Sequence, residues 1–169
     1  MTSVFANNGI LCQPQILKTR NSKLETRNCR KLPISEKTIN TIREGMKKAC
    51  EPGGTGWPLF EFKVKDRSII SQNLSENSQI TSLPQSGSTE KLISQQASTN
   101  YRLISTGCKT GTAESQSKDS EPHAWFTVFA PFDKPEIILT VFVEEGGQGS
   151  DIAGPIAKEI LKTYFERTE

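Results

Sequence analysis

The sequence Lys109-Thr110-Gly111-Thr112 combines a cation, two hydroxyls and a residue without a side chain in four consecutive positions. On a strand at the edge of a sheet, Lys109 and the hydroxyls of Thr110 and Thr112 can bind a carboxylate through charge-assisted hydrogen bonds. Gly111 lets the backbone of a ligand approach closely, so that the ligand adds to the edge as a further strand. The tetrapeptide therefore predicts a binding site for an extended ligand that carries a carboxylate.

Three strands are predicted around this tetrapeptide. A strand over Tyr101–Cys108 leads into it, and two more apolar strands follow over Ala124–Pro131 and Glu136–Glu144. The short turn at 133–135 predicts that the last two strands pair as an antiparallel hairpin. Because the strand over 136–144 is apolar on both alternating faces, we expect its sheet to be covered on both sides.

Two helices are predicted to cover this sheet. Residues 33–50 have apolar side chains at helical spacing, and Ser35 is a favourable N-cap. A C-terminal helix is predicted after Ser150 or Gly154, with Pro155 in its first turn. Its apolar residues are predicted to line one side: Ile152, Ile156, Ile160, Leu161, Tyr164 and Phe165. The predicted fold class is α+β, with an antiparallel sheet flanked by helices.

Two other segments complete the organisation of the chain. Residues 1–16 are predicted to contain the end of a helix, a turn at Gly9 and the start of a strand. Residues 65–100 hold nine of the 17 serines and show neither helical nor strand periodicity. We expect this stretch to form a long, polar, exposed insertion before the Tyr101 strand.

The composition limits the classes of function. The 169 residues are enough for one medium domain. The chain has 21 Lys and Arg against 19 Asp and Glu residues, which argues against a dedicated nucleic-acid binder. The sequence shows neither a signal peptide nor a run of roughly 18 apolar residues that would span a bilayer.

The four cysteines, Cys12, Cys29, Cys50 and Cys108, are far apart in the sequence and form no C-x-x-C pair. Together with a single histidine, His123, they do not predict a zinc cluster, and neither a metal nor a cofactor is expected. A disulfide stays open, but the simplest expectation is four free thiols, with Cys108 buried as a packing residue. His123, beside a strand, is expected to be structural rather than catalytic.

Segments on both sides of the tetrapeptide match a known arrangement. They are Val4-Phe5-Ala6-Asn7-Asn8-Gly9, Gln13-Pro14, Arg43-Glu44-Gly45-Met46, Gly53-Gly54-Thr55-Gly56, Pro122-His123-Ala124-Trp125-Phe126-Thr127, Phe129-Ala130-Pro131, Glu144-Glu145-Gly146-Gly147-Gln148-Gly149-Ser150 and Ala153-Gly154-Pro155-Ile156-Ala157. Lys-Thr-Gly itself is a motif of penicillin-interacting serine enzymes. With Cys108–Glu114, these segments resemble the transpeptidase domain of class B penicillin-binding proteins, the penicillin-binding protein 2 type in particular. The resemblance covers roughly residues 1–60 and 101–169 and leaves out the Ser-rich insertion.

The resemblance implies that residues 1–169 are the C-terminal portion of a peptidoglycan D,D-transpeptidase domain with the serine transpeptidase (β-lactamase-like) fold. The ligand would be a peptidoglycan stem peptide or a β-lactam, both of which carry a carboxylate, and the protein would act in the cell envelope, at the outer face of the cytoplasmic membrane. Lys109, Thr110 and Gly111 are then assigned to catalysis, and Thr110 and Thr112 to substrate binding. In the family, the backbone N–H at the position of Thr112 is one donor of the oxyanion hole, and the lysine helps protons move between serine side chains.

The family's nucleophilic Ser-x-x-Lys and its Ser-x-Asn motif both precede Lys-Thr-Gly. Matches in this sequence stand in the wrong places: Ser88-Thr89-Glu90-Lys91, Ser115-Gln116-Ser117-Lys118, Ser71-Gln72-Asn73 and Ser75-Glu76-Asn77. Three of the four fall in the Ser-rich insertion, where no helix N-terminus is predicted that would activate a serine. We therefore expect that an N-terminal part of the domain, outside these residues, supplies the serine, and that this chain alone is inactive as a transpeptidase.

Two alternatives stay open. In the first, the chain is a non-enzymatic truncated or split product that acts only through a partner chain. In the second, it is a serine β-lactamase-like relative. That class also requires Ser-x-x-Lys, and the long polar insertion before Lys-Thr-Gly does not favour it. An upstream reading frame that encodes Ser-x-x-Lys would indicate one enzyme, whereas an upstream stop codon would indicate a separate product.

Overall fold

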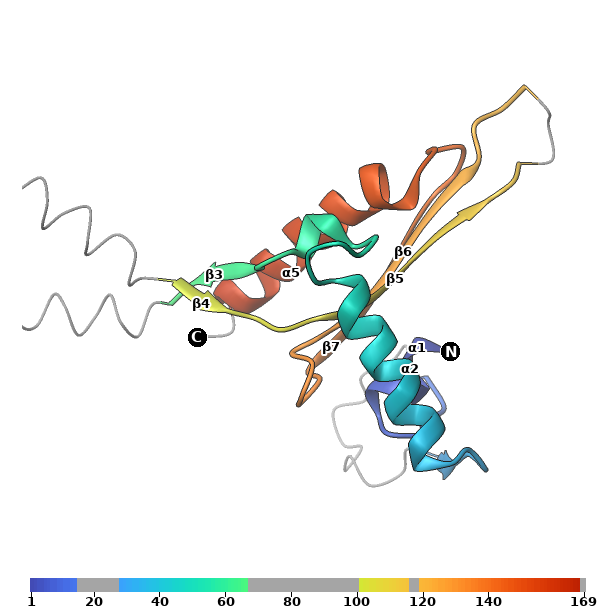
Figure 1. Ribbon diagram of the computed structural model, residues 1–169, viewed down its shortest axis with the longest axis vertical. Coiled ribbons are helices and arrows are strands. Elements are labelled where there is room, and N and C mark those ends of the chain that lie inside the picture. Colours follow the sequence, from blue (N-terminus) through green and yellow to red (C-terminus); the bar gives the residue numbers. More distant parts are fainter. Residues whose placement is uncertain (15–27, 67–100, 116–118, 168–169) are drawn as a thin grey trace, which may run out of the picture.

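The computed structural model describes residues 1–14, 28–66, 101–115 and 119–167. Its elements follow the chain in this order: α1 (Thr2–Ala6), β1 (Ile10–Cys12), β2 (Cys29–Lys31), α2 (Glu36–Ala49), η2 (Trp57–Leu59), β3 (Lys63–Lys65), β4 (Tyr101–Leu103), β5 (Gly107–Ala113), β6 (His123–Ala130), β7 (Ile137–Val143), η3 (Gly149–Ala153) and α5 (Gly154–Arg167). In Figure 1, α5 runs alongside β6, and the short pair of β3 and β4 lies beside the C-terminal end of α5. The antiparallel strands and flanking helices confirm the predicted α+β class.

The largest sheet of the described residues has the order β5-β6-β7, with both pairs antiparallel. The predicted hairpin is confirmed, because β6 and β7 pair along their length, with Thr127 opposite Thr140. One face of this sheet is fully buried at Ala124, Phe126 and Val128. These side chains belong to the same apolar cluster as the buried side of α5, so α5 covers this face.

The opposite face is covered along only part of its length. Phe129 is buried in a second cluster, whose other buried members are Ala6 of α1, Met46 of α2, and Phe132. On the same face, Trp125 and Phe142 are 41% and 47% exposed, with their ring centroids 4.4 Å apart. The expected two-sided cover of the sheet therefore holds at the Phe129 end and not at the Trp125 end.

The strand predicted over Tyr101–Cys108 is two strands in the structure. β4 pairs with β3, whereas β5 pairs with β6. Between them, the Ile104 N–H donates to the Phe62 carbonyl and the Phe132 N–H donates to the Ser105 carbonyl, each at 2.9 Å. The chain thus changes its pairing partner at this point, and the tetrapeptide lies within β5 rather than at the end of a strand.

Most of the predicted insertion, residues 67–100, lies outside the described residues. Its flanks are described, and Lys65 pairs with Tyr101 at the end of the ladder between β3 and β4. The Lys65 N–H also donates to a carboxylate oxygen of Glu166 in α5, at 3.3 Å. The two ends of the insertion are therefore neighbours, beside the C-terminal end of α5.

Both predicted helices are present. α2 begins after Ser35, whose Oγ accepts a hydrogen bond from the Thr38 N–H at 3.1 Å, so the predicted N-cap is confirmed. The turn between α1 and β1 contains Gly9 at a φ of +88°, a conformation that favours glycine. Every helix in the described part of the chain is too short or too polar to cross a bilayer.

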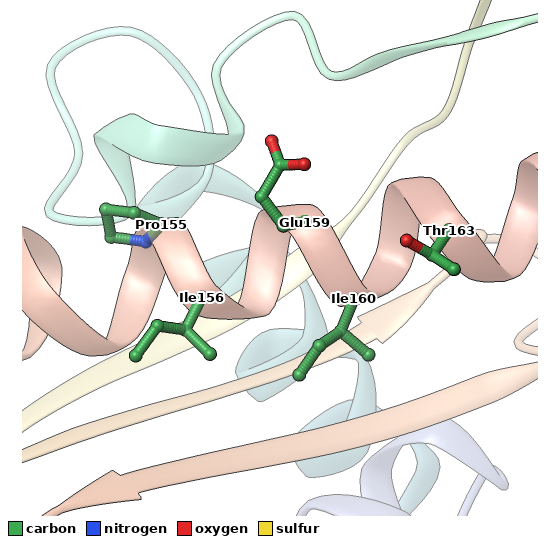
Figure 2. A pocket seen from close by; sticks show the side chains of 5 residues that line it. All are labelled: Pro155, Ile156, Glu159, Ile160 and Thr163. Carbon is green, nitrogen blue, oxygen red and sulfur yellow. The ribbon is translucent and has the colours of Figure 1, made fainter.

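α5 begins at Gly154, with Pro155 in its first turn as predicted, but it buries only one of two adjacent apolar stripes. The buried stripe consists of Gly154, Ala157, Leu161 and Phe165. The isoleucines of the other stripe are 41–43% exposed: Ile152, Ile156 and Ile160. Figure 2 shows Ile156 and Ile160 projecting from the same side of α5, where they help to line an open groove of about 550 Å³. The prediction that all six apolar residues face one way is therefore wrong.

The prediction of four free thiols is also wrong, because the cysteines form two disulfides. Cys12 and Cys29 are opposite each other in the β1–β2 ladder, with their Cα atoms 4.0 Å apart. Cys50, at the C-cap of α2, joins Cys108 of β5 with a Cα separation of 5.7 Å. Tertiary structure brings together pairs that are 17 and 58 residues apart in sequence. Cys108 is fully buried, as predicted.

Candidate active site on strand β5

The tetrapeptide lies on an edge strand of the described sheet. β5 pairs with β6 on one side, with Lys109 opposite Thr127 and Gly111 opposite Trp125. It stands at one end of the order β5-β6-β7. Because side chains alternate along a strand, Lys109 and Gly111 share one face of the sheet. Thr110 and Thr112 share the other face with the buried Cys108. The predicted edge position is thus confirmed for the described residues.

Each threonine hydroxyl of the tetrapeptide has a partner on a neighbouring loop. Thr110 Oγ1 donates to Thr55 Oγ1 at 2.9 Å, and Thr112 Oγ1 donates to Gln148 Oε1 at 3.3 Å. The two loops are also joined, because Ser150 Oγ donates to the Thr55 carbonyl at 2.6 Å. Ser150 therefore ties the loops together and does not cap α5 through its side chain. The hydrogen bonds that Thr55 and Gln148 accept from the two hydroxyls fix the position of these hydroxyls.

Glycines allow both loops to lie directly against β5. A Cβ on Gly56 would lie 2.3 Å from Cys108 Sγ, and a Cβ on Gly149 would lie 2.5 Å from the Gly111 carbonyl oxygen. Both distances are shorter than any real contact of a Cβ atom, so a side chain at either position would push its loop away from the strand. At Gly56 and Gly149, the backbone of each loop therefore packs directly on the candidate site.

The Cys50–Cys108 disulfide fixes the start of the tetrapeptide. It joins the C-cap of α2 to the residue directly before Lys109. The loop that carries Thr55 is held to the same helix end, because the Gly56 N–H donates to the Ala49 carbonyl at 2.7 Å. The covalent bond and the hydrogen bond together set the distance between α2, this loop and β5.

Lys109 is exposed, and its Nζ donates to the carbonyl of Thr110 on its own strand. Among the described residues, no carboxylate lies within ion-pair distance of its ammonium group. No side chain rises from β5 at Gly111, on the same face as Lys109. A Cβ placed there would have close neighbours only in the side chain of Trp125, the nearest at 3.2 Å. The motif thus presents a solvent-accessible cation and two oriented hydroxyls around a backbone without a side chain.

The other residues singled out from the sequence lie away from this arrangement or outside the described ranges. His123 Nδ1 accepts a hydrogen bond from the Glu145 N–H at 3.0 Å, and its ring packs near Phe142, which agrees with a structural role. Ser115 lies beyond the end of β5, and its Oγ donates to Glu145 Oε1 at 3.4 Å. Ser71, Ser75, Ser88 and Lys118 are outside the described residues. Within the described ranges, no cluster of three or more His, Cys, Asp or Glu side chains forms a metal site.

Thr55, Gln148 and Ser150 are site residues that were not predicted from the sequence. Each belongs to a glycine-rich segment that was noted for its resemblance to the family, but a single hydroxyl or amide in a loop has no spacing that predicts its partner. The glycines themselves were the available signal, since a close approach of backbone to a strand requires them.

A comparison with protein families supports the resemblance of the whole chain. The family described as "Penicillin binding protein transpeptidase domain" matches residues 1–69 and 58–162. The chain belongs to this family. The family predicted from the Lys-Thr-Gly motif and its flanking segments is thereby confirmed.

The chain is similar to parts of two peptidoglycan D,D-transpeptidases. It is 34% identical over 84 residues to the peptidoglycan D,D-transpeptidase MrdA of Haemophilus influenzae, covering 42% of this chain and 12% of that protein. It is 38% identical over 60 residues to the peptidoglycan D,D-transpeptidase PbpA of Mycolicibacterium smegmatis, covering 31% and 12%. The chain thus spans about an eighth of the length of these relatives.

The fold agrees with two crystal structures of penicillin-binding proteins. The D,D-transpeptidase domain of a peptidoglycan glycosyltransferase from Eggerthella lenta matches with a TM-score of 0.57 and 20% identity, over 97% of this chain and 30% of that one. Penicillin-binding protein A of Mycobacterium tuberculosis, solved as a ceftriaxone acyl-enzyme complex, matches with a TM-score of 0.52 and 19% identity, over 95% of this chain and 29% of that one. At this level of identity, the likeness concerns the fold.

Proposed function

We propose that this chain forms part of a peptidoglycan D,D-transpeptidase and that β5 binds the carboxylate of a stem peptide or a β-lactam. The observation that carries the proposal is the pair of oriented hydroxyls on Thr110 and Thr112 beside the exposed Lys109, on an edge strand of a family member. The ammonium and the hydroxyls supply charge-assisted hydrogen bonds to the carboxylate. The ligand backbone lies along the strand at Gly111, where no side chain obstructs it.

In this proposal, the reaction is acyl transfer. A serine attacks the penultimate D-alanine carbonyl, D-alanine leaves, and the acyl group passes to an amine of a neighbouring stem peptide. The Thr112 N–H acts as one donor to the oxyanion, and Lys109 supports proton movement near the serine. The serine of Ser-x-x-Lys comes from an N-terminal part of the domain outside these 169 residues, so the chain alone does not form an acyl-enzyme. The site acts in the cell envelope, at the outer face of the cytoplasmic membrane.

Intact-mass spectrometry of the chain after incubation with excess benzylpenicillin tests this proposal, with a full-length relative as the positive control. We expect no covalent adduct on this chain, and an adduct on the control. A stable gain of one penicillin mass at a single serine, such as Ser88 or Ser115, would show that the nucleophile lies within these residues. That result would overturn the assignment of the serine to another segment.

Binding without acylation separates this proposal from the non-enzymatic alternative. We expect N-acetyl-D-alanyl-D-alanine to shift the backbone amide resonances of Gly111 and Thr112, and its methyl ester to shift them much less. A chain that acts only through a partner and has lost the site would show no response to either ligand. That result would overturn the carboxylate site.

A further inference from the structure

Thr55 lies outside the motif, yet it makes the hydrogen bond that sets the direction of the Thr110 hydroxyl. Thr55 Oγ1 is the acceptor of the Thr110 proton at 2.9 Å. Its own backbone is fixed, because Ser150 Oγ donates to the Thr55 carbonyl at 2.6 Å. The next residue, Gly56, is pressed against Cys108 and hydrogen-bonded to the end of α2. Thr55 is therefore held from two sides against β5.

A hydroxyl has one proton to donate and two lone pairs to accept, and its proton rotates freely about the C–O bond. Without ligand, the Thr110 proton points to Thr55. A carboxylate accepts hydrogen bonds and donates none. It therefore has to receive the Thr110 proton, and this leaves the Thr110 oxygen free to accept the proton of Thr55. The hydrogen bond between these two oxygens, which are 2.9 Å apart in the structure, would then reverse its direction.

We propose that Thr55 is a positioning residue that reverses its hydrogen bond to Thr110 when a carboxylate binds to β5. This inference rests on the proposed carboxylate site and adds to it a residue outside the Lys-Thr-Gly motif. The Thr55 proton polarises the Thr110 hydroxyl, so that the chain Thr55–Thr110–carboxylate is stronger than the last bond alone. The Thr55 side chain also keeps the Thr110 oxygen at the position from which it reaches the ligand.

The chain offers a matched control. Thr127 and Thr140 form a second pair of hydroxyls at 2.9 Å, across β6 and β7 of the same sheet. Neither belongs to β5 or to the loops that contact its threonines. Thr140→Val therefore removes a hydroxyl from an equivalent pair without touching the proposed chain of hydrogen bonds.

The test is a titration of the ¹⁵N-labelled 169-residue chain with N-acetyl-D-alanyl-D-alanine and with its methyl ester, followed through the Gly111 and Thr112 amides. We expect Thr55→Val to weaken binding of the acid by about three- to tenfold, the size of one hydrogen bond. The ester, which lacks the charge, loses little. Thr55→Ser, which restores the hydroxyl, should recover the affinity for the acid, and Thr140→Val should leave both ligands unchanged.

Each outcome decides one of the two claims. An equal loss for acid and ester in Thr55→Val, or no rescue by serine, would show that Thr55 only packs against the strand and would overturn the inference. An unchanged affinity for the acid in Thr55→Val would overturn it as well. If the wild-type chain does not distinguish the acid from the ester, the carboxylate site itself is refuted, whatever the variants show.

Discussion

The Cys50–Cys108 disulfide offers the sharpest test of how the candidate site is held together. Replacing both cysteines by alanine removes a cross-link between residues 58 apart. In the chain-entropy account, closing a loop of this length costs the unfolded chain about 4 kcal/mol, and we expect the double variant to lose that much stability. This is a large share of the roughly 5–15 kcal/mol that stabilises a typical domain.

The second disulfide supplies the matched control. Cys12 and Cys29 are 17 residues apart, which predicts a loss of about 3 kcal/mol for the corresponding double alanine variant. Urea unfolding followed by circular dichroism measures both losses on the same scale. The two variants therefore differ little in stability, but only the first one releases α2 and the loop of Thr55 from β5.

Hydrogen exchange of the β5 amides separates these two effects. We expect residues 109–112 to lose protection by more than the global loss of stability when Cys50 and Cys108 are replaced, and by no more than the global loss when Cys12 and Cys29 are replaced. Two results would refute the reasoning. One is a loss of stability below about 1 kcal/mol in the Cys50 and Cys108 variant, because the chain-entropy account predicts a larger loss for a loop of this length. The other is equal loosening of β5 by both variants.

Single substitutions at three positions test the packing of the loop on β5 and the stability of α2. Gly56→Ala places a Cβ 2.3 Å from Cys108 Sγ and should cost about 2 kcal/mol in urea unfolding, as overpacking does; no measurable loss would contradict the close packing of the loop on β5. Gly45→Ala is its control, because an added Cβ meets nothing within 4 Å on the exposed side of α2, and it should gain about 1 kcal/mol. Ser35→Ala removes the cap on the Thr38 N–H and should cost about 1 kcal/mol, whereas Ser35→Asp should retain the stability.

The elements that were predicted correctly from the sequence are those whose signals lie close together in the chain. The hairpin of β6 and β7 has alternating apolar residues around a short turn, and α2 has a Ser35 cap before an apolar stripe. These signals lie within a few residues of the structure they produce. The family motif has the same character, because Lys109–Thr112 is contiguous in the chain.

The structural features that were not predicted from the sequence depend on contacts between segments that are distant in the chain. The strand over Tyr101–Cys108 divides because β4 finds its partner in β3, on the far side of the insertion. The disulfides depend on pairs that no spacing rule connects. In α5, two adjacent stripes are both apolar, so periodicity alone does not decide which one faces the sheet.

The support around β5 divides the three motif residues with polar side chains into two kinds. Thr110 and Thr112 are held in place before any ligand binds, because their hydroxyls donate hydrogen bonds to two loops that are themselves packed against the strand. Lys109 is exposed, and within the described part of the chain its ammonium donates to a carbonyl of its own strand. Hydroxyl oxygens that are held in place confer selectivity for the geometry of a carboxylate, since their positions are set in advance. An exposed ammonium contributes attraction over a longer range, which salt screens. In the proposed site, the threonines therefore recognise the shape of the ligand's carboxylate, and the lysine supplies the charge that draws it to the edge of the sheet.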